Sequence, residues 1–302
     1  PTLIEPSEGA TISPSPDQEF DFTKENKFTV TSQDGQFKKS YLVEAVSTFD
    51  YRYNFEEWKP DDSQKRYPEL TDQLWKSGNS GIYLMPPMLQ PKYPYPTSFT
   101  NDCVEGEKAA MLQTLKGKEV FGDLYALFSG SLYYGVFTLK QGASESPKGV
   151  LFGHPHPKSA GKPVRMTGYY KYQPGEVYTD KDQNPVAGKV DECTIRAFLY
   201  KVRIGAKTGA VFGEDYLTGK DDVLNSEQVV AIADLKDGSA KKEFTFFDIQ
   251  FEHRQPIDYT QNDFRLAIVF SSSKRGDFYE GAAGSTLIVD DVRIICEDFK
   301  EE

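Results

Sequence analysis

The stretch "STLIVDDVRIIC" (residues 285–296) decides the fold, because it has the composition of a buried β-strand. Its β-branched residues favour a strand. The small residues of "GAAGS" (281–285) are typical of a turn into a strand where two backbones approach closely. Two carboxylates, Asp290 and Asp291, interrupt the apolar run. We therefore expect a β-strand near the end of the sequence.

Six upstream segments repeat this pattern, each rich in β-branched and aromatic residues and bounded by Gly, Pro, Asp or Asn. They are "GSLYYGVFTL" (130–139), "VRMTGYYKYQPG" (164–175), "CTIRAFLYKV" (193–202), "VVAIADL" (229–235), "KEFTFFDIQFEH" (242–253) and "DFRLAIVFSSS" (263–273). Strands at such spacing predict an all-β protein, a jelly-roll β-sandwich. "KAAMLQTLKG" (108–117) fits either a helix or a buried strand.

The first residues predict a separate, small β unit. Two strand-like runs flank "SQDGQ" (32–36), and Asp34-Gly35 indicates a hairpin because glycine adopts positive φ without steric cost. From about residue 48 the composition changes to aromatic residues mixed with charged and turn-forming residues. We therefore expect two domains, residues 1–47 and 48–302.

Charge and cysteine content limit the partners. The formal net charge is −11 with no basic stripe, which makes nucleic acid an unfavourable partner. Cys103, Cys193 and Cys296 are far apart and form no CxxC, which argues against a zinc site. We expect buried free thiols, although one bridge stays open. No stretch has the length of a membrane span.

Three short motifs are better explained as turns than as sites. Residues 275–277 spell Arg-Gly-Asp, a match too short to indicate adhesion. His154 and His156 are two apart in a prolyl loop, with no third metal ligand nearby, so we expect exposed imidazoles. "DKDQNP" (180–185) starts like a calcium loop, but the later Gly and Glu do not follow at the required spacing.

Aromatic residues give the strongest indication of a ligand. Flat rings match the C–H faces of sugars, and we expect Trp58, Trp75, Tyr170 and Tyr172 to stack on them. Strand alternation places Tyr170 and Tyr172 on one side and Tyr169 on the other. The alternative for each is an ordinary core residue, since aromatic residues dominate β cores.

Polar candidates complete the predicted site. Asn79, Arg165 and Glu280 are expected to bond sugar hydroxyls; Glu280 is chosen because it lies in the loop before the closing strand. A hydrolase would instead need two facing carboxylates, but the chain has 46 acidic residues and no catalytic motif to select a pair. Asp290 and Asp291 are adjacent, so in a strand they should point to opposite faces.

Several stretches together resemble the "putative carbohydrate metabolism domain" of Bacteroidetes surface proteins. The set runs, in order, "YPTSFTNDCVEGEKAAMLQT", "GSLYYGVF", "KPVRMTGYYKYQPGE", "DECTIRAFLY" and "VFSSSKRGDFYEGAAGSTLIVDDVRI". The resemblance covers about residues 48–299 and implies a jelly roll related to carbohydrate-binding modules. "FGHPHPKSAGKPVRM" (152–166) departs from the family pattern, so the family gives no role to His154 or His156.

The N-terminal stretch "SEGATISPSPDQEFDFTKENKFTVTSQDG" is similar to the small immunoglobulin-like units that precede such domains. This similarity implies an exported protein that handles glycans at the outer membrane or cell surface. It also implies a lipoprotein, with membrane attachment only through a lipid anchor outside this sequence, and possible outer-membrane protein partners.

The resemblance also bears on the two acidic residues of the closing strand. In carbohydrate-binding jelly rolls the first Asp of a final "VDDV" strand often ligates a structural calcium, which here would be Asp290. The alternative is a carboxylate that accepts backbone N–H groups. No other cofactor is expected.

We therefore expect non-catalytic binding of an oligosaccharide or polysaccharide. Two alternatives stay open. One is a glycoside hydrolase or lyase with paired carboxylates, and the other is a structural or adhesin-like surface protein.

Overall fold

The computed structural model describes residues 6–15, 18–20, 26–43, 48–59, 67–84, 95–120, 123–138, 149–206 and 216–299. The chain folds into two compact units, one holding Pro1–Thr48 and the other Phe49–Phe299. No helix among these described residues is long and apolar enough to span a membrane.

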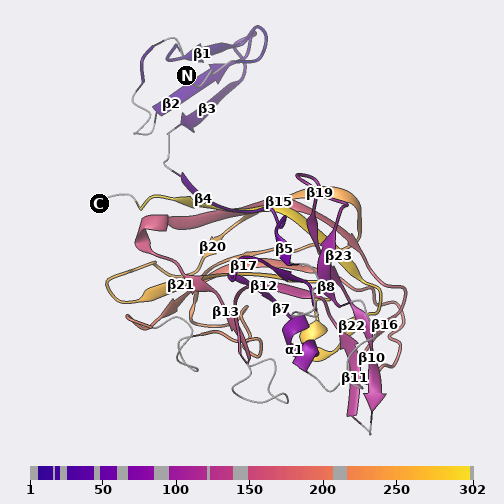
Figure 1. Cartoon of the computed structure of the whole chain (residues 1–302). Coiled ribbons are helices and arrows are strands. Elements are labelled where there is room, and N and C mark those ends of the chain that lie inside the picture. Colours follow the sequence, from indigo (N-terminus) through magenta and orange to yellow (C-terminus); the bar gives the residue numbers. More distant parts are fainter. Residues whose placement is uncertain are drawn as a thin grey trace. The chain divides into compact units, whose positions relative to one another are not determined.

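The first unit contains a three-stranded antiparallel sheet in the order β1-β2-β3 (Figure 1). Its strands are β1 (Thr11–Ser13), β2 (Asn26–Thr31) and β3 (Lys38–Val43). The predicted hairpin at Asp34-Gly35 is confirmed, since β2 and β3 pair across it and Gly35 has a φ of 72°. The immunoglobulin-like architecture of this unit stays a prediction.

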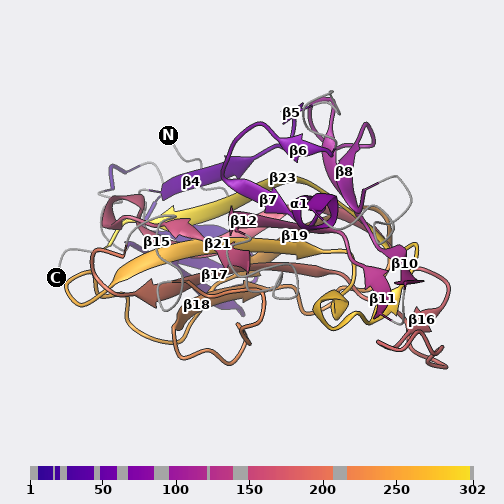
Figure 2. The same cartoon turned by 60° about the horizontal axis from the view of Figure 1, so that its bottom comes forward.

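The second unit is built on two large sheets, so the all-β prediction is confirmed. The eight-stranded sheet joins strands from across the sequence: β13 (Val150–Phe152), β12 (Ser131–Phe137), β21 (Asp263–Ser271), β17 (Thr194–Val202), β18 (Val229–Asp234) and β20 (Glu252–His253), with β7 (Trp75–Ser77) on β12 and β14 (His154–Pro155) on β21. Figure 2 shows β21, β17 and β18 side by side in this order.

The six-stranded sheet forms the opposite layer. Its order is β19 (Lys241–Gln250), β15 (Lys162–Gln173), β23 (Thr286–Glu297), β9 (Ala109–Gln113) and β8 (Thr97–Thr100), with β4 (Thr48–Tyr53) on β23. The closing stretch of the sequence is thus β23, a central strand, and residues 109–113 form a strand rather than a helix. β19 lies at one edge of this sheet.

Short elements complete the unit. They are β5 (Trp58–Lys59) with β6 (Glu69–Leu70), β10 (Leu115–Val120) with β11 (Asp123–Phe128), β16 (Tyr178–Thr179) with β22 (Gly281–Ala282), helix α1 (Asn79–Leu84), and two 3-10 turns, Lys158–Ala160 and Gly276–Phe278.

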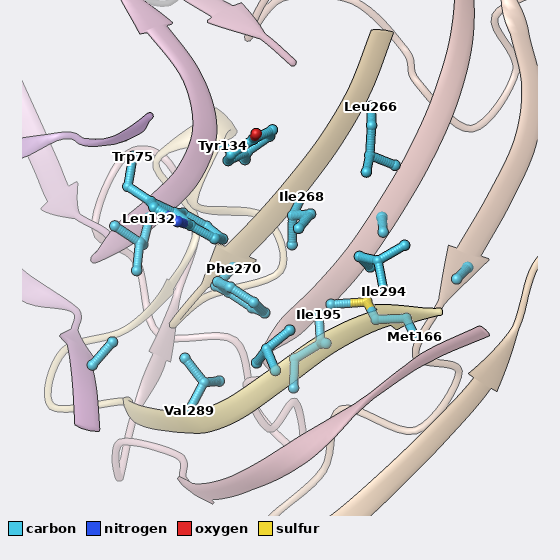
Figure 3. Close-up of a cluster of buried hydrophobic side chains, with 14 of the residues drawn as sticks. Trp75, Leu132, Tyr134, Met166, Ile195, Leu266, Ile268, Phe270, Val289 and Ile294 are labelled. Atoms are coloured by element: carbon cyan, nitrogen blue, oxygen red, sulfur yellow. The ribbon is translucent and has the colours of Figure 1, made fainter. Parts of the chain in front are cut away.

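The main core lies between the two sheets (Figure 3). Met166 and Ile294 of the six-stranded sheet, and Ile195 and Phe270 of the other, are all fully buried. Each such side chain contributes about 1.5–3 kcal/mol by leaving water. The inward side chains therefore fix which face of each sheet remains outside; we call this the outer face.

The turn before β23 is held by one buried carboxylate. Asp191 Oδ2 accepts the hydroxyls of Ser273 (2.6 Å) and Ser285 (2.8 Å) and the backbone N–H of Ala282 (2.8 Å). Gly281, with a φ of 154°, packs so closely on Ser273 that a Cβ would lie 2.6 Å from its hydroxyl oxygen. The small residues of "GAAGS" are thus explained by close approach, as the sequence predicted.

Candidate functional site

The four aromatic residues predicted to stack on sugars lie in the core, so this prediction is wrong. Trp75 is 1% exposed and stacks on Phe270, with ring centroids 5.8 Å apart. Tyr170 and Tyr172 point inward from β15, and the Tyr172 hydroxyl donates to the Ser272 carbonyl (3.0 Å).

Trp58 is also buried, and its indole N–H donates to the Phe55 carbonyl (2.7 Å). The expected alternation along β15 is correct, but the side chosen for the ligand is the inward one. Burial therefore leaves none of these four rings open to a sugar.

The predicted hydroxyl-bonding residues Asn79 and Glu280 hold the fold together. The amide of Asn79 is fully buried; it donates to the carbonyls of Pro68 (3.1 Å) and Thr97 (2.6 Å) and accepts the Thr97 N–H (3.2 Å). Glu280 accepts two bonds from the Arg275 guanidinium (2.7 and 3.1 Å), which lowers the pKa of its carboxyl. Burial therefore closes Asn79 to a sugar, and the Glu280 side chain is only 20% exposed.

Arg165 is the one predicted site residue that faces solvent on a sheet. It points outward from β15 and bonds Asp248 of β19 through both Nε (2.9 Å) and Nη2. This fork holds the Asp248 oxygens in a fixed orientation while leaving the pair about a third to a half exposed. Such oriented, partly exposed polar groups suit recognition of sugar hydroxyls.

Two aromatic rings follow Arg165 and Asp248 on the same outer face. Tyr169 and Phe246 are cross-strand neighbours, with ring centroids 5.2 Å apart and planes tilted by 55°. Phe246 is 53% exposed, which is unusual for a residue that is normally buried. We call the outward side chains of β15 and β19 the aromatic face.

The aromatic face continues past this pair. Phe244 lies beside Phe246 on the same side of β19, and the Lys171 ammonium sits 5.1 Å from the Phe244 ring centroid. Lys171 also bonds Asp102 (2.7 Å). The face therefore alternates aromatic rings with paired charges, a combination that offers both stacking and hydrogen bonding.

Sequence signals could have identified this face. In "KEFTFFDIQ" the residues Phe244, Phe246 and Asp248 share one side of the strand, and the charged residue marks that side as the solvent side. In "VRMTGYYKYQ" the charges of Arg165 and Lys171 likewise mark the side of Tyr169.

The two adjacent acidic residues of β23 are bonded to groups of the protein itself, an arrangement that does not favour the predicted calcium site. Asp290 is fully buried; its carboxylate accepts backbone N–H groups of Val104 (2.7 Å), Glu105 (3.1 Å) and Asp291 (2.8 Å). Both oxygens are thus surrounded by N–H donors, which suits an anion and not calcium. No group of three or more His, Cys, Asp or Glu side chains able to hold a metal occurs among the residues that the structure describes.

A bulge overturns the expected orientation of these two residues. Pairing between β15 and β23 shifts at this point, and Asp291 has a φ of 44°. Asp291 binds Arg52 (3.0 Å), which also binds Glu105 of the loop that caps Asp290. Both carboxylates therefore bond groups in or beside that loop, and the two-residue alternation fails here.

The acidic motif and the Arg-Gly-Asp motif form turns that are held by bonds within the protein. Asp180 accepts the N–H groups of Asp182 and Asn184 (both 2.9 Å), which confirms a turn. In the Arg-Gly-Asp turn, Arg275 is held by Glu280.

The two histidines of the prolyl loop are also bonded to the fold. His154 bonds the Leu74 carbonyl (2.9 Å) through Nε2. His156 is buried between the Tyr51 hydroxyl (3.2 Å) and the Gly161 carbonyl (2.8 Å), so the expectation of exposed imidazoles is wrong there.

The three cysteines are free. Cys193 and Cys296 are buried as expected, and burial raises the pKa of both thiols to about 12. Cys103 is partly exposed.

Beside the aromatic face, a hollow of about 370 Å³ opens between β18 and β19. Its walls carry Asp234, Asp237, Asp248 and Glu252, and we call it the acidic hollow. Each of these carboxylates lies within 4 Å of a cation: they pair with Arg196, Lys241, Arg165 and Arg254, respectively. The hollow is therefore acidic in composition but largely neutralised.

Comparisons with known proteins agree with this architecture. Residues 48–295 match the family described as "Putative carbohydrate metabolism domain". The chain belongs to this family. Residues 1–45 match a second family, the N-terminal domain of SGBP, a name for surface glycan-binding proteins. No curated protein matches the chain.

Two crystal structures resemble this member of the carbohydrate metabolism family over most of its length. One is a putative glycoside hydrolase from Bacteroides thetaiotaomicron VPI-5482, 30% identical, with a TM-score of 0.67, covering 98% of this chain and 84% of that one. The other is a putative glycoside hydrolase from Bacteroides vulgatus ATCC 8482, 25% identical, with a TM-score of 0.64, covering 81% and 97%.

Proposed function

We propose that this protein binds an oligosaccharide or polysaccharide at the bacterial cell surface without cleaving it, and that the aromatic face is its binding surface. The contact of the exposed Phe246 ring with the partly buried Tyr169 ring, beside the Arg165–Asp248 fork, is the observation that carries the proposal. Membership of a carbohydrate-related family and the match of residues 1–45 support it. A lipid anchor and outer-membrane partners stay predictions.

The chemistry of the face suits sugars. The negative face of an aromatic ring attracts the polarised C–H groups of a pyranose, while the oriented oxygens of Asp248 accept its hydroxyl protons. Aromatic anchors of this kind carry most of the energy in binding sites. The proposal therefore assigns the stacking role to Tyr169 and Phe246, in place of the buried tryptophans.

The charges of the acidic hollow favour binding over hydrolysis. A glycosidase needs one carboxyl group whose pKa is raised so that it remains protonated. Asp237 instead has its pKa lowered by Lys241 and Ser239, and the other three carboxylates of the hollow each pair with an arginine. Each carboxylate of the hollow is therefore engaged in an ion pair.

The test compares Phe246→Ala with Phe278→Ala. Both phenylalanines are exposed to a similar degree, 53% and 54%, but Phe278 lies in the turn before β22. We expect affinity electrophoresis against a panel of plant and host polysaccharides to show retardation of the wild type. Phe246→Ala should lower the affinity for the retarding polysaccharide by about tenfold or more, the loss typical of an aromatic anchor. Phe278→Ala should bind like the wild type.

Reducing-end assays on the same polysaccharides distinguish binding from hydrolysis. The hydrolase alternative is favoured by the names of the two similar crystal structures. Release of new reducing ends by the wild type would establish that alternative. Retardation that survives both Phe246→Ala and Tyr169→Ala would instead reject the aromatic face as the binding surface.

A further inference from the structure

A second hollow, of about 490 Å³, lies on the other side of β20 from the acidic hollow. Glu252 lines the acidic hollow, and the next residue, His253, lines this one. Its walls carry the basic side chains of Lys162, His253 and Arg254, together with Gln255, Pro256, Ile257 and Phe299. We call it the basic hollow.

The charge of the basic hollow is opposite to that of the protein. The chain has a formal net charge of −11, yet none of the seven lining residues is acidic. The neighbouring acidic hollow has four carboxylates and one lysine on its walls. Arg254 is shared with Glu252, and burial and Lys162 lower the pKa of His253, so the positive charge that favours an anionic ligand here comes mainly from Lys162.

Lys162 is available for such a ligand. Glu297 lies opposite it in the register of β15 and β23, but the two side chains form no ion pair, and Lys162 makes none with any other described residue. Arg254 is partly engaged: Nη1 donates to the Leu224 carbonyl (2.6 Å) and Nε lies 3.5 Å from Glu252. The His253 ring is fixed by a bond to the Pro163 carbonyl (2.9 Å).

The hollow also lies in line with the aromatic face. A register shift between Pro163 and Arg165 places Lys162 and Arg165 on the same side of β15, opposite Glu297 and Ile295. Seven residues separate Lys162 from Tyr169, or about 23 Å of extended strand. A glycan chain lying along β15 would therefore reach both.

We propose that the basic hollow binds a carboxylate or sulfate group of an acidic sugar within the glycan that the aromatic face holds. Lys162 and Arg254 would contact the anion, and the apolar walls formed by Ile257 and Phe299 would contact the ring. This inference rests on the proposed function and specifies its ligand as an anionic glycan. Carboxylate and sulfate share this chemistry, and the experiment distinguishes them.

The test uses matched ligands with the full chain. Polygalacturonate is compared with its methyl ester, and dextran sulfate with dextran, by isothermal titration calorimetry. We expect preference for one charged form over its neutral partner. Lys162→Gln should weaken the charged ligand about tenfold, the value of one charge-assisted hydrogen bond. Lys236→Gln, at an 80% exposed lysine of the acidic hollow, is the control of equal charge and should bind normally.

Imidazole NMR signals locate the anion independently of the aromatic face. The chain has three histidines, and only His253 lines the basic hollow. Sodium galacturonate or sodium sulfate should shift the His253 signals and leave those of His154 and His156 in place, whereas galactose should shift none. Unmoved His253 signals, or equal binding of charged and neutral polymers, would overturn the inference. Loss of all binding in Phe246→Ala with His253 still responsive would uphold both proposals.

Discussion

The outer faces of the two large sheets differ in what covers them. On the eight-stranded sheet, Phe198 and Tyr200 point away from the main core yet are fully buried, because Leu217 and Val223 pack over them in a second hydrophobic cluster. On the six-stranded sheet, Phe246 points outward and is 53% exposed. An outward aromatic residue is thus a structural residue on one sheet and a candidate binding residue on the other.

The strands that carry these residues differ in their sequence pattern. The run "AFLY" in β17 is apolar without interruption, which is typical of a strand buried on both faces. β15 and β19 alternate apolar with polar residues, which is typical of one buried and one solvated face. An exposed aromatic ring is therefore informative when it occurs on the polar side of an alternating strand.

The largest expected effect is a difference in stability loss between a variant on each of the two outer faces. Phe198→Ala should lower the free energy of unfolding by about 3–5 kcal/mol, because it leaves a cavity under the second cluster. Phe246→Ala should change it by less than about 1 kcal/mol, since the ring is already half in water. Urea unfolding followed by tryptophan fluorescence measures both. Equal losses would show that the two faces are covered alike, and would remove the basis for the binding surface.

The next largest effect on stability is expected at Asp290, where a loop covers the outer face of the six-stranded sheet. Asp290 holds the loop of residues 101–107 through the N–H groups of Val104 and Glu105. Asp290→Asn should cost about 1–3 kcal/mol, because an amide cannot accept all three N–H groups that the carboxylate accepts. Loosening this loop should leave the buried face of the eight-stranded sheet unchanged.

The stability difference between the wild type and Asp290→Asn should change with pH in a definite direction. Burial outweighs the N–H donors and raises the pKa of Asp290 above its usual 3.8, so the folded protein binds this proton more tightly than the unfolded chain does. The contribution of this carboxyl to stability is therefore full below pH 3.8 and is lost as the pH rises through the raised pKa. The unfolding difference between wild type and Asp290→Asn should be larger at about pH 4 than at about pH 7. A difference that grows with pH would contradict this assignment.

The sequence predicted the class of fold because strand periodicity is a local property. The closing strand, the hairpin at Asp34-Gly35 and the alternation of Tyr169 against Tyr170 all follow from side-chain spacing and turn chemistry. Spacing does not state which side of a strand meets the other sheet. That choice depends on non-local packing, which explains why the ligand role predicted for Tyr170 and Tyr172 fails and both are core residues.

Other failures had different physical causes. The bulge at Asp291 depends on the pairing of β23 with β15, so no local sequence pattern predicts it. Asn79 is a polar residue whose partners, the backbone groups of Pro68 and Thr97, lie 11 and 18 residues away. The charges of Arg165 and Lys171, by contrast, are sufficient to mark the solvent side of β15, and the predicted site includes only Arg165.

The smallest expected effect compares two arginine–aspartate pairs, one on each sheet. Arg165 bonds Asp248 on the aromatic face, and Arg196 bonds Asp234 (2.7 Å) at a less exposed position on the eight-stranded sheet. Lysine keeps the charge of arginine and loses the fork. Arg196→Lys should therefore cost about 1 kcal/mol of stability, the value of one partly buried hydrogen bond. Arg165→Lys should cost less than about 0.5 kcal/mol, as exposed pairs do.

The two arginine variants should rank in the opposite order for glycan affinity. Asp248 would lose the fork that orients its oxygens, so Arg165→Lys should weaken binding by a few-fold, measured by calorimetry beside the unfolding experiment. If Arg165→Lys loses stability as Arg196→Lys does, and binds glycan as the wild type does, the fork is a structural tie. The recognition of hydroxyls would then have to come from another polar group of the face, such as the exposed Gln250 opposite Arg165.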